Sequence, residues 1–300
     1  MIPPPVFGAK RRFAWRRTGD APARPDASSR RAGAAHRQVG GRVSVVLLAG
    51  GYGTRLYPLT THCPKALLPL HGGVVLDVIV ETLRSIEGLS RIVLVTNHRF
   101  LKQFRAWHAT RAVNLKIVDD GSTTPETRRG ALPDLLLGLD QVGPRDDVLV
   151  LGTDNLFTWS LAKFVAFAKT KRPAATVALR KASSLQVARR CGVVKLDRHG
   201  RVTECVEKPQ HPPSLIIGLC VYYFPVPSRQ RIREFVKRRA ANLDAPGYFL
   251  EWLVTREPVY GCMTRGAWFD IGSPDAYHHV VRWWGRRRKP TVNRKRVTVA

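Results

Sequence analysis

Residues 43–56 read VSVVLLAGGYGTRL, and this stretch decides the fold. Its first half is apolar and rich in valine, which is typical of a strand buried on both faces of a parallel sheet. Its second half places Gly50, Gly51 and Gly53 directly after that strand. Glycines at such a place let the backbone approach a phosphate closely, with its N–H groups turned inward. The stretch therefore predicts an α/β protein with a glycine-rich, anion-binding loop after its first strand.

Short apolar runs alternate with segments of helical spacing after this stretch. In the first such segment, the apolar residues at positions 76, 79, 80, 83 and 86 share one face of a helix. This β–α alternation predicts a Rossmann-like, mostly parallel sheet with helices on both faces. We expect strands at residues 43–48, 92–96, 115–118, 148–151 and 176–179, and helices at 76–86, 100–107, 135–139 and 161–168.

The pattern changes at about residue 185. Strand-like runs at 193–196, 202–206 and 215–224 follow one another with few helices between them. Helical spacing returns at 231–239, at 249–255 and after Pro274. The sequence therefore predicts a more β-rich portion in the second half, folded on the same sheet, with no internal repeat.

The charge is strongly positive. The chain has 50 Lys and Arg against 22 Asp and Glu, a net charge of +28, which indicates a polyanionic partner such as nucleic acid, a membrane surface or phosphorylated metabolites. Residues 1–42 hold ten basic and two acidic residues, and residues 282–300 hold eight basic and none acidic. More than half of the excess therefore lies outside the best-patterned part, residues 43–281.

Two features of the composition exclude other classes of protein. Hydrophobic residues make up 44% of the chain, which excludes a wholly disordered protein. No run approaches the roughly 18 consecutive apolar residues that a membrane-spanning helix needs, so we do not expect an integral membrane protein.

Residues 1–42 are expected to be a disordered basic extension, because they mix Pro, Ala, Ser, Gly and Arg without apolar periodicity. Three interpretations stay open: a transit peptide, a basic arm for nucleic acid, or an upstream extension from a wrongly chosen start. Only Met1 and Met263 occur, so a shorter product would begin at another codon, such as that of Val43.

Residues 282–300 are expected to be a basic tail. Its Trp283 and Trp284 could stack on nucleic acid bases, since aromatic side chains beside basic ones do so. The favoured interpretation is an aromatic pair at the end of a helix that packs on the core.

The cysteines are odd in number and form no Cys-x-x-Cys pair, which argues against a disulfide framework or a zinc site. We therefore expect a reducing, cytoplasmic compartment. The five are Cys63, Cys191, Cys205, Cys220 and Cys262.

Two basic side chains follow the glycine loop. Arg55 lies in the loop itself, and Lys65 follows ten residues later. A glycine cradle, a guanidinium and an ammonium together make a clamp for a triphosphate. The loop is not a P-loop, because no Gly-Lys-Ser/Thr follows, and it is not a dinucleotide fingerprint, because Leu56 stands where the third glycine belongs.

An ordered set of motifs resembles the sugar-1-phosphate nucleotidyltransferases, which include glucose-1-phosphate thymidylyltransferases and mannose-1-phosphate guanylyltransferases. The resemblance covers roughly residues 43–280. The motifs are LAGGYGTRLYPLT at 48–60, PK at 64–65, LGTDNLF at 151–157, CGVV at 191–194, EKP at 207–209, GL at 218–219 and WFDIGSP at 268–274.

The resemblance implies a reaction between an NTP and a sugar 1-phosphate. An oxygen of the sugar phosphate attacks the α-phosphorus, pyrophosphate leaves, and an NDP-sugar forms. Residues 43–281 would be the nucleotidyltransferase domain, with the sugar bound by its β-rich second half. Asp154 and Asp270 would hold Mg²⁺ between the reacting phosphates, because this cation takes hard oxygen ligands.

The same resemblance assigns roles to the basic and sugar-site residues. Arg55 would stabilise charge on the triphosphate, and Lys65 would contact the phosphates. Lys208 would bind the sugar phosphate, Glu207 a sugar hydroxyl, and Gly192 would approach the sugar. The nucleotide would be bound by Leu48, Ala49, Gly50, Gly51, Gly53, Thr54 and Gly130.

One difference from the family motifs leaves the identity of the nucleotide base undetermined. Family members of the thymidylyl type read the base with a Gln shortly before a Gly-Leu-Ala, and residues 119–132 contain no Gln. Asp120 and Thr124 are the candidates to replace it, and the sequence does not choose between them.

Other function classes are less favoured. A non-catalytic regulatory protein on the same fold should have lost Arg55, Lys65 or an aspartate, and all are present. A nucleic-acid-binding protein would act through the basic termini, with steep salt dependence. A glycosyltransferase would have an Asp-x-Asp, and residues 153–155 do not form one.

Overall fold

The computed structural model describes residues 41–238 and 243–287. Most of the expected N-terminal extension, residues 1–42, and residues 288–300 of the expected basic tail lie outside the described residues. The expectations of disorder and of a nucleic-acid arm therefore stay predictions.

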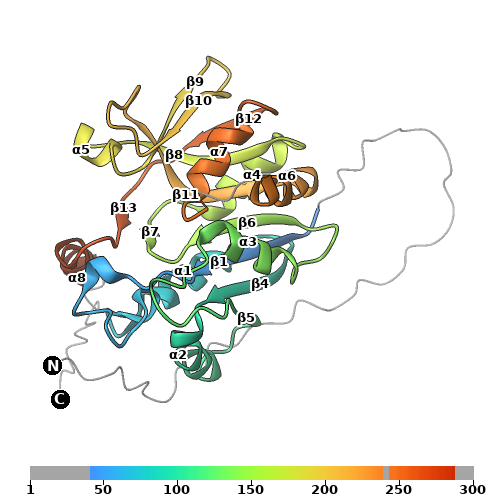
Figure 1. Ribbon diagram of the computed structural model, residues 1–300. Coiled ribbons are helices and arrows are strands. Elements are labelled where there is room, and N and C mark those ends of the chain that lie inside the picture. Colours follow the sequence, from blue (N-terminus) through green and yellow to red (C-terminus); the bar gives the residue numbers. More distant parts are fainter. Residues whose placement is uncertain (1–40, 239–242, 288–300) are drawn as a thin grey trace, which may run out of the picture.

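The glycine loop follows the central strand of a nine-stranded sheet. Strand β1 (Val43–Ala49) lies between β4 (Leu89–Thr96) and β6 (Asp147–Gly152), and both neighbours run parallel to it. Strand β5 (Leu115–Asp119) continues the parallel order beyond β4. Figure 1 shows these four strands across the lower part of the molecule. The predicted parallel α/β half is confirmed.

The second half extends the same sheet with antiparallel strands. Strand β11 (Ile216–Phe224) pairs with β6 and with β8 (Ala175–Lys181). Strands β9 (Gly192–Leu196) and β10 (Val202–Glu207) form an antiparallel ladder beside it. Strand β12 (Val259–Met263), which the sequence did not predict, runs parallel to β8.

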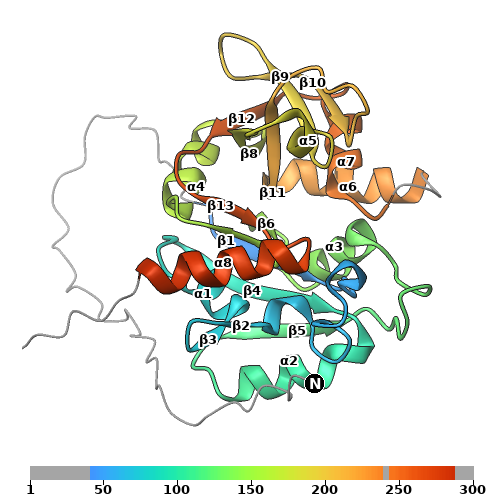
Figure 2. The same ribbon diagram turned by 90° about the vertical axis from the view of Figure 1, so that its left-hand side faces the viewer.

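Helices cover both faces of the sheet, as predicted. Neighbouring residues of β1 explain why, since Val45 and Leu47 join one core cluster and Val46 joins the other. The first cluster lies under α1 (Val75–Leu83), α2 (His98–Ala109), α4 (Leu161–Thr170) and α8 (Pro274–Arg287). The second lies under α3 (Ala131–Leu139), α6 (Val226–Arg238) and α7 (Pro246–Leu253) (Figure 2).

Short elements complete the chain. They are β2 (Pro69–Leu70), β3 (Gly73–Val74), β7 (Asn155–Phe157), β13 (Trp268–Asp270), α5 (Leu185–Ala188) and two 3-10 turns, η1 (Thr54–Leu56) and η2 (Lys65–Leu67).

The aromatic pair near the C-terminus lies on α8 and packs on the protein. The ring of Phe269 is 4.8 Å from the ring of Trp283 and 6.3 Å from that of Trp284. Trp284 also packs against the larger core cluster. The two indoles therefore pack as the favoured interpretation expects. No helix in residues 41–238 and 243–287 has the length and apolar character of a membrane span.

Candidate active site

A cleft of about 560 Å³ opens at the carboxyl ends of β1 and β6. It is lined by the glycine loop, the start of α3, the turn after β6, the start of β9, the end of β10, the middle of β11, residues 244–247 and β13. Every predicted site residue lines it except Ala49, whose side chain is buried in the core because alternate residues of β1 face opposite sides. The predicted residues that line it are Leu48, Gly50, Gly51, Gly53, Thr54, Arg55, Lys65, Gly130, Asp154, Gly192, Glu207, Lys208 and Asp270.

Each glycine of the loop occupies its position for a different physical reason. Gly53 has a φ of 64°, in the left-handed region, and its carbonyl accepts a hydrogen bond of 2.7 Å from the Thr60 hydroxyl. Gly51 is exposed, and a Cβ there would meet no atom within 4 Å, so its backbone is open to the cleft. A Cβ at Gly50 would collide with the carboxylate of Asp134. Gly50 is therefore required by packing against α3.

Two cations approach the cleft from the 3-10 turns. Arg55 is an exposed residue of η1. Lys65 opens η2, and its Nζ lies 3.0 Å from Oδ2 of Asp154. The sequence predicts that Lys65 contacts the phosphates. In the structure its ammonium binds the carboxylate of Asp154, which the resemblance assigns to Mg²⁺.

Asp154 and Asp270 come together through a two-stranded ladder. Strands β7 and β13 pair antiparallel with Asp270 opposite Asn155, and the Ile271 N–H donates to the Asp154 carbonyl at 2.9 Å. The side-chain amide of Asn155 donates to Oδ1 of Asp154 at 2.7 Å and accepts from the Trp268 indole at 2.9 Å. The ladder thus places two carboxylates from distant parts of the chain in one cleft.

The electrostatics of these two carboxylates differ. Desolvation acts to raise the pKa of Asp154, but the adjacent Lys65 outweighs it and holds the pKa below its usual value. Desolvation in the cleft, together with repulsion from Asp154, raises the pKa of Asp270. The carboxylates therefore repel one another, and a cation between them would relieve that repulsion.

The donor set fits Mg²⁺. Within residues 41–238 and 243–287, no group of three or more His, Cys, Asp or Glu side chains could enclose a metal ion. Mg²⁺ does not need such a group, because it keeps several waters and is usually bound by one or two carboxylates together with substrate phosphates.

The end of the cleft where the resemblance would place the sugar is built on β9 and β10. Gly192 lies opposite Glu207 in that ladder, and the Glu207 side chain is only 7% exposed. Burial raises the pKa of Glu207, partly offset by the ammonium of Lys208, whose Nζ lies 3.7 Å from Oε1. Lys208 has a φ of 49°, a left-handed conformation that is uncommon for a lysine. A Cβ at Gly247, in the first turn of α7, would collide with Glu207.

Sequence reasoning missed several lining residues. Asp134 is an acid in the first turn of a helix, an ordinary position for one, and its closeness to the glycine loop is a tertiary contact without a local signal. Residues 244–247 reach the cleft because the Leu132 N–H donates to the Leu243 carbonyl at 2.9 Å. The other missed lining residues include Arg128, Arg129, Arg190, Cys191, Cys220, Tyr222 and Trp268.

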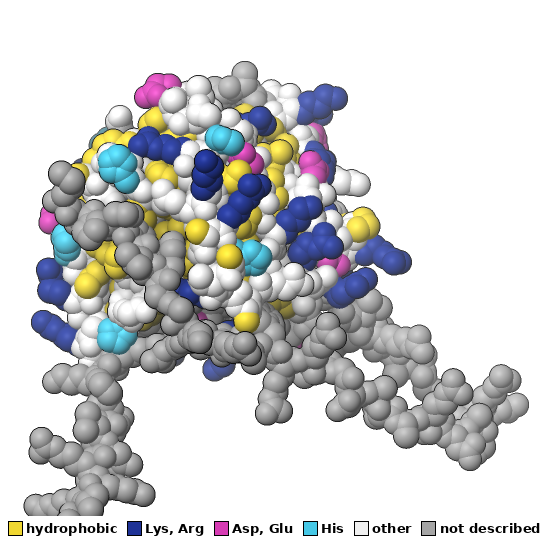
Figure 3. Space-filling view, turned by 90° about the horizontal axis from the view of Figure 1, so that it is seen from below, with side chains coloured by type: hydrophobic (Ala, Val, Ile, Leu, Met, Phe, Trp, Pro, Cys, Tyr) yellow, Lys and Arg dark blue, Asp and Glu magenta, His cyan; other side chains and the backbone are white. Residues whose placement is uncertain are grey.

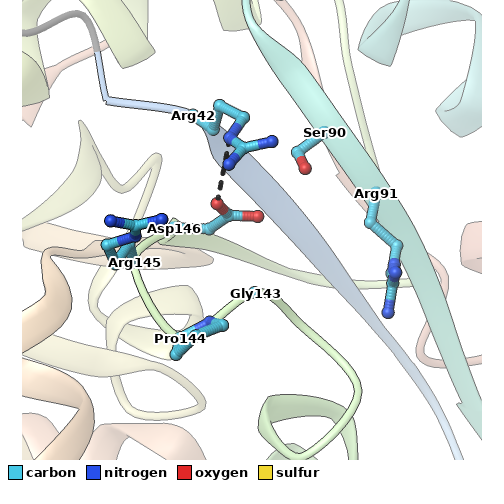
Figure 4. A pocket seen from close by; sticks show the side chains of 7 residues that line it. All are labelled: Arg42, Ser90, Arg91, Gly143, Pro144, Arg145 and Asp146. Carbon is cyan, nitrogen blue, oxygen red and sulfur yellow. Dashed lines mark ion pairs between the residues drawn. The ribbon is translucent and has the colours of Figure 1, made fainter.

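A second, smaller cavity of about 180 Å³ lies at the opposite end of the parallel strands, where β1 begins. Figure 4 shows its lining, in which Nε of Arg42 is 3.7 Å from Oδ1 of Asp146. It contains none of the predicted site residues. The larger cleft is therefore the candidate active site.

Known proteins share this fold and sequence pattern. The chain is 26% identical over 238 residues to the low-salt glycan biosynthesis nucleotidyltransferase of Haloferax volcanii, covering 77% of this chain and 62% of that protein. It is 28% identical over 253 residues to a glucose-1-phosphate thymidylyltransferase of Xanthomonas campestris, covering 79% of each chain. The chain thus spans less than two thirds of the Haloferax protein.

A solved structure of a UDP-glucose pyrophosphorylase complexed with UDP-glucose matches with a TM-score of 0.67 at 20% identity, covering 82% of this chain and all of that one. This likeness supports the α/β fold. The family model described as nucleotidyl transferase matches residues 44–283, which confirms the resemblance drawn from the motifs. The chain therefore belongs to the nucleotidyl transferase family.

Proposed function

We propose that this protein is a sugar-1-phosphate nucleotidyltransferase, which joins an NTP and a sugar 1-phosphate into an NDP-sugar and releases pyrophosphate. The observation that carries the proposal is that the glycine loop, two cations, a carboxylate pair and the Glu207–Lys208 pair all line one cleft. Membership of the family and the names of its relatives support the same reaction.

The nucleotide would occupy the end of the cleft beside the glycine loop. Leu48, Gly50, Gly51, Gly53 and Thr54 would bind it from one side. Gly130 would bind it from the other side, at the start of α3.

Phosphoryl chemistry of this kind asks mainly for positioning and charge neutralisation. Arg55 would stabilise the charge that develops on the departing pyrophosphate. Lys65 would hold Asp154 in place and lie beside the reacting phosphates, since its ammonium is 3.0 Å from that carboxylate. Asp154 and Asp270 would hold Mg²⁺, which when bound neutralises charge between the phosphates.

The sugar 1-phosphate would occupy the other end. The buried Glu207 carboxylate would accept a hydrogen bond from a sugar hydroxyl, and Lys208 would pair with the sugar phosphate. Gly192 would approach the sugar beside Glu207, and a glycine is needed there because a Cβ would lie 2.8 Å from the Glu207 carboxylate. The odd number of cysteines and the lack of a Cys-x-x-Cys pair in the sequence support the proposed cytoplasmic, reducing compartment.

The test is pyrophosphate release with a panel of NTPs and sugar 1-phosphates in Mg²⁺. We expect turnover with at least one pair, and a loss of at least about 100-fold in Asp154→Asn and Asp270→Asn. Asp275→Asn, an exposed aspartate of α8, is the matched control and should keep the activity. Folded protein without turnover on any pair would refute the proposal and favour the non-catalytic alternative.

A further inference from the structure

Two carboxylates lie side by side at the nucleotide end of the cleft. Asp120, just after β5, is 2% exposed, and Asp134, in the first turn of α3, is 5% exposed. Both line the cleft. A Cβ at Gly50 would meet the Oδ2 atoms of both, so the two side chains converge under the glycine loop.

The two carboxylates hydrogen-bond to each other and differ in their other partners. Oδ1 of Asp120 accepts a hydrogen bond of 2.6 Å from the Ser122 N–H. Oδ1 of Asp134 is buried without a hydrogen-bond partner among the described residues. A buried acceptor left unmet is costly, so such an atom calls for a partner such as a ligand or an ordered water. Asp134 therefore lines the cleft and carries a buried acceptor that no described residue uses.

The other candidate for reading the base does not reach the cleft. Thr124 is exposed and exchanges hydrogen bonds with Thr127 within its own turn. It is absent from the cleft lining, which Asp120 and Asp134 share. Of the two candidates, only Asp120 lines the cleft, and it does so beside Asp134.

We infer that Asp134, positioned by Asp120, reads the base of the NTP and selects guanine. The inference rests on the proposed function, since it needs an NTP in the cleft. When ionised, a carboxylate is an acceptor with two oxygens and no proton to donate. Guanine presents two adjacent donors on one edge, N1–H and the 2-amino group, and a carboxylate accepts both.

The other bases present mixed edges. Adenine and cytosine each place an amino donor beside a ring-nitrogen acceptor, and uracil and thymine flank N3–H with two carbonyl acceptors. Each of these bases would bring one of its acceptors against an oxygen of the carboxylate, and that oxygen would be left without a donor. A site built on unpaired polar groups rejects a ligand that does not satisfy them.

The protonation state of the pair gives a further expectation. Burial and the adjacent Asp120 raise the pKa of Asp134 to about 7, opposed by the Arg129 guanidinium. Burial and Asp119 raise the pKa of Asp120, opposed by Ser122 and Arg129. Because guanine needs the ionised acceptor, the preference for GTP should weaken as the pH falls below about 7.

The experiment measures the dissociation constants of GTP, ITP, ATP and UTP by calorimetry in Mg²⁺ with the full chain. ITP is the sharpest probe, because it differs from GTP only by the missing 2-amino group. We expect GTP to bind about tenfold more tightly than ITP, and this ratio to fall towards one in Asp134→Asn, whose amide puts a donor against guanine. Asp119→Asn is the matched control, since Asp119 is outside the cleft lining and pairs with His98.

The outcomes separate the inference from the proposed function. If no NTP binds the folded wild-type protein, the proposed function fails. If NTPs bind but GTP is not preferred, or Asp134→Asn lowers the melting temperature while the GTP/ITP ratio is unchanged, the carboxylate pair only packs the glycine loop and the inference fails. If the Asp119→Asn control changes the ratio as much as Asp134→Asn does, the effect is general electrostatics, and the inference also fails.

Discussion

The contact between Lys65 and Asp154 joins residues 89 positions apart, and the sequence did not predict it. The local patterns placed both residues at the site, because each lies in a motif just after a strand or turn. They could not show that the ammonium and the carboxylate bind each other. Contacts of this kind depend on how the β1 loop and the β6 turn lie across the sheet.

Replacing Lys65 should cost activity and change the pH profile. In Lys65→Met we expect a loss of about 100-fold or more in kcat, because a positioned charge is removed from the site. The pKa of Asp154 should rise once its counter-charge is gone, so the acidic limb of the pH profile of kcat/KM should move to higher pH. Lys65→Arg keeps the charge and should retain more activity. Wild-type turnover in Lys65→Met would contradict this role.

Asp134 should make the stability of the protein depend on pH. Its pKa is raised from 3.8 to about 7, so the folded state binds this proton more tightly than the unfolded state. The resulting stabilisation is fully present below pH 3.8 and is lost as the pH rises to about 7, by at most about 4 kcal/mol. Urea denaturation should therefore show a smaller fall in stability between pH 5 and pH 8 in Asp134→Asn than in the wild type. Equal slopes in the two proteins would contradict a raised pKa.

At the scale of elements, the sequence predicted best where periodicity is strong. Strand β1 and helix α1 were predicted within a few residues, because β-branched runs and a one-sided apolar face are local signals. Strand β12 was missed because Gly261 and Cys262 interrupt its short apolar pattern. Strands β7 and β13 are three residues each and exist through their mutual pairing.

The packing of the glycine loop against α3 can be tested by a double-mutant cycle. Gly50→Ala should destabilise the protein by about 1–3 kcal/mol, because the added methyl group meets the Asp134 carboxylate. The cost should be smaller in an Asp134→Ala background, where that carboxylate is gone. Urea denaturation measures all four proteins. Gly51→Ala, with open space around the new Cβ, is the matched control; strictly additive free energies would show that the two sites do not touch.

At the scale of the whole molecule, the net positive charge and the candidate active site are largely separate features. The described surface carries lysine and arginine side chains scattered among histidine and hydrophobic side chains on the face shown in Figure 3. The proposed chemistry uses few of the 50 basic residues, chiefly Arg55, Lys65 and Lys208. The net charge of +28 is therefore a poor guide to the proposed substrate.

Removing the basic N-terminal residues should leave catalysis intact. Among the described residues, those that line the cleft all fall between Leu48 and Asp270, so we expect deletion of residues 1–40 to change kcat and KM by less than about twofold. Steady-state kinetics at two salt concentrations measures this. A large rise in KM at low salt alone would mean that the deleted charges attract the nucleotide over distance.

The pairing of β6 with β11 makes one sheet of the two halves. The strands pair without a break from one end of the cleft to the other, so moving the two ends apart would break the hydrogen bonds between β6 and β11. The sheet then sets the spacing between the two proposed substrates, and adjustment is left to the connecting loops. The loops before β9 and after β10 could accordingly be exchanged to accept a different sugar while the proposed geometry of the reacting phosphates is kept.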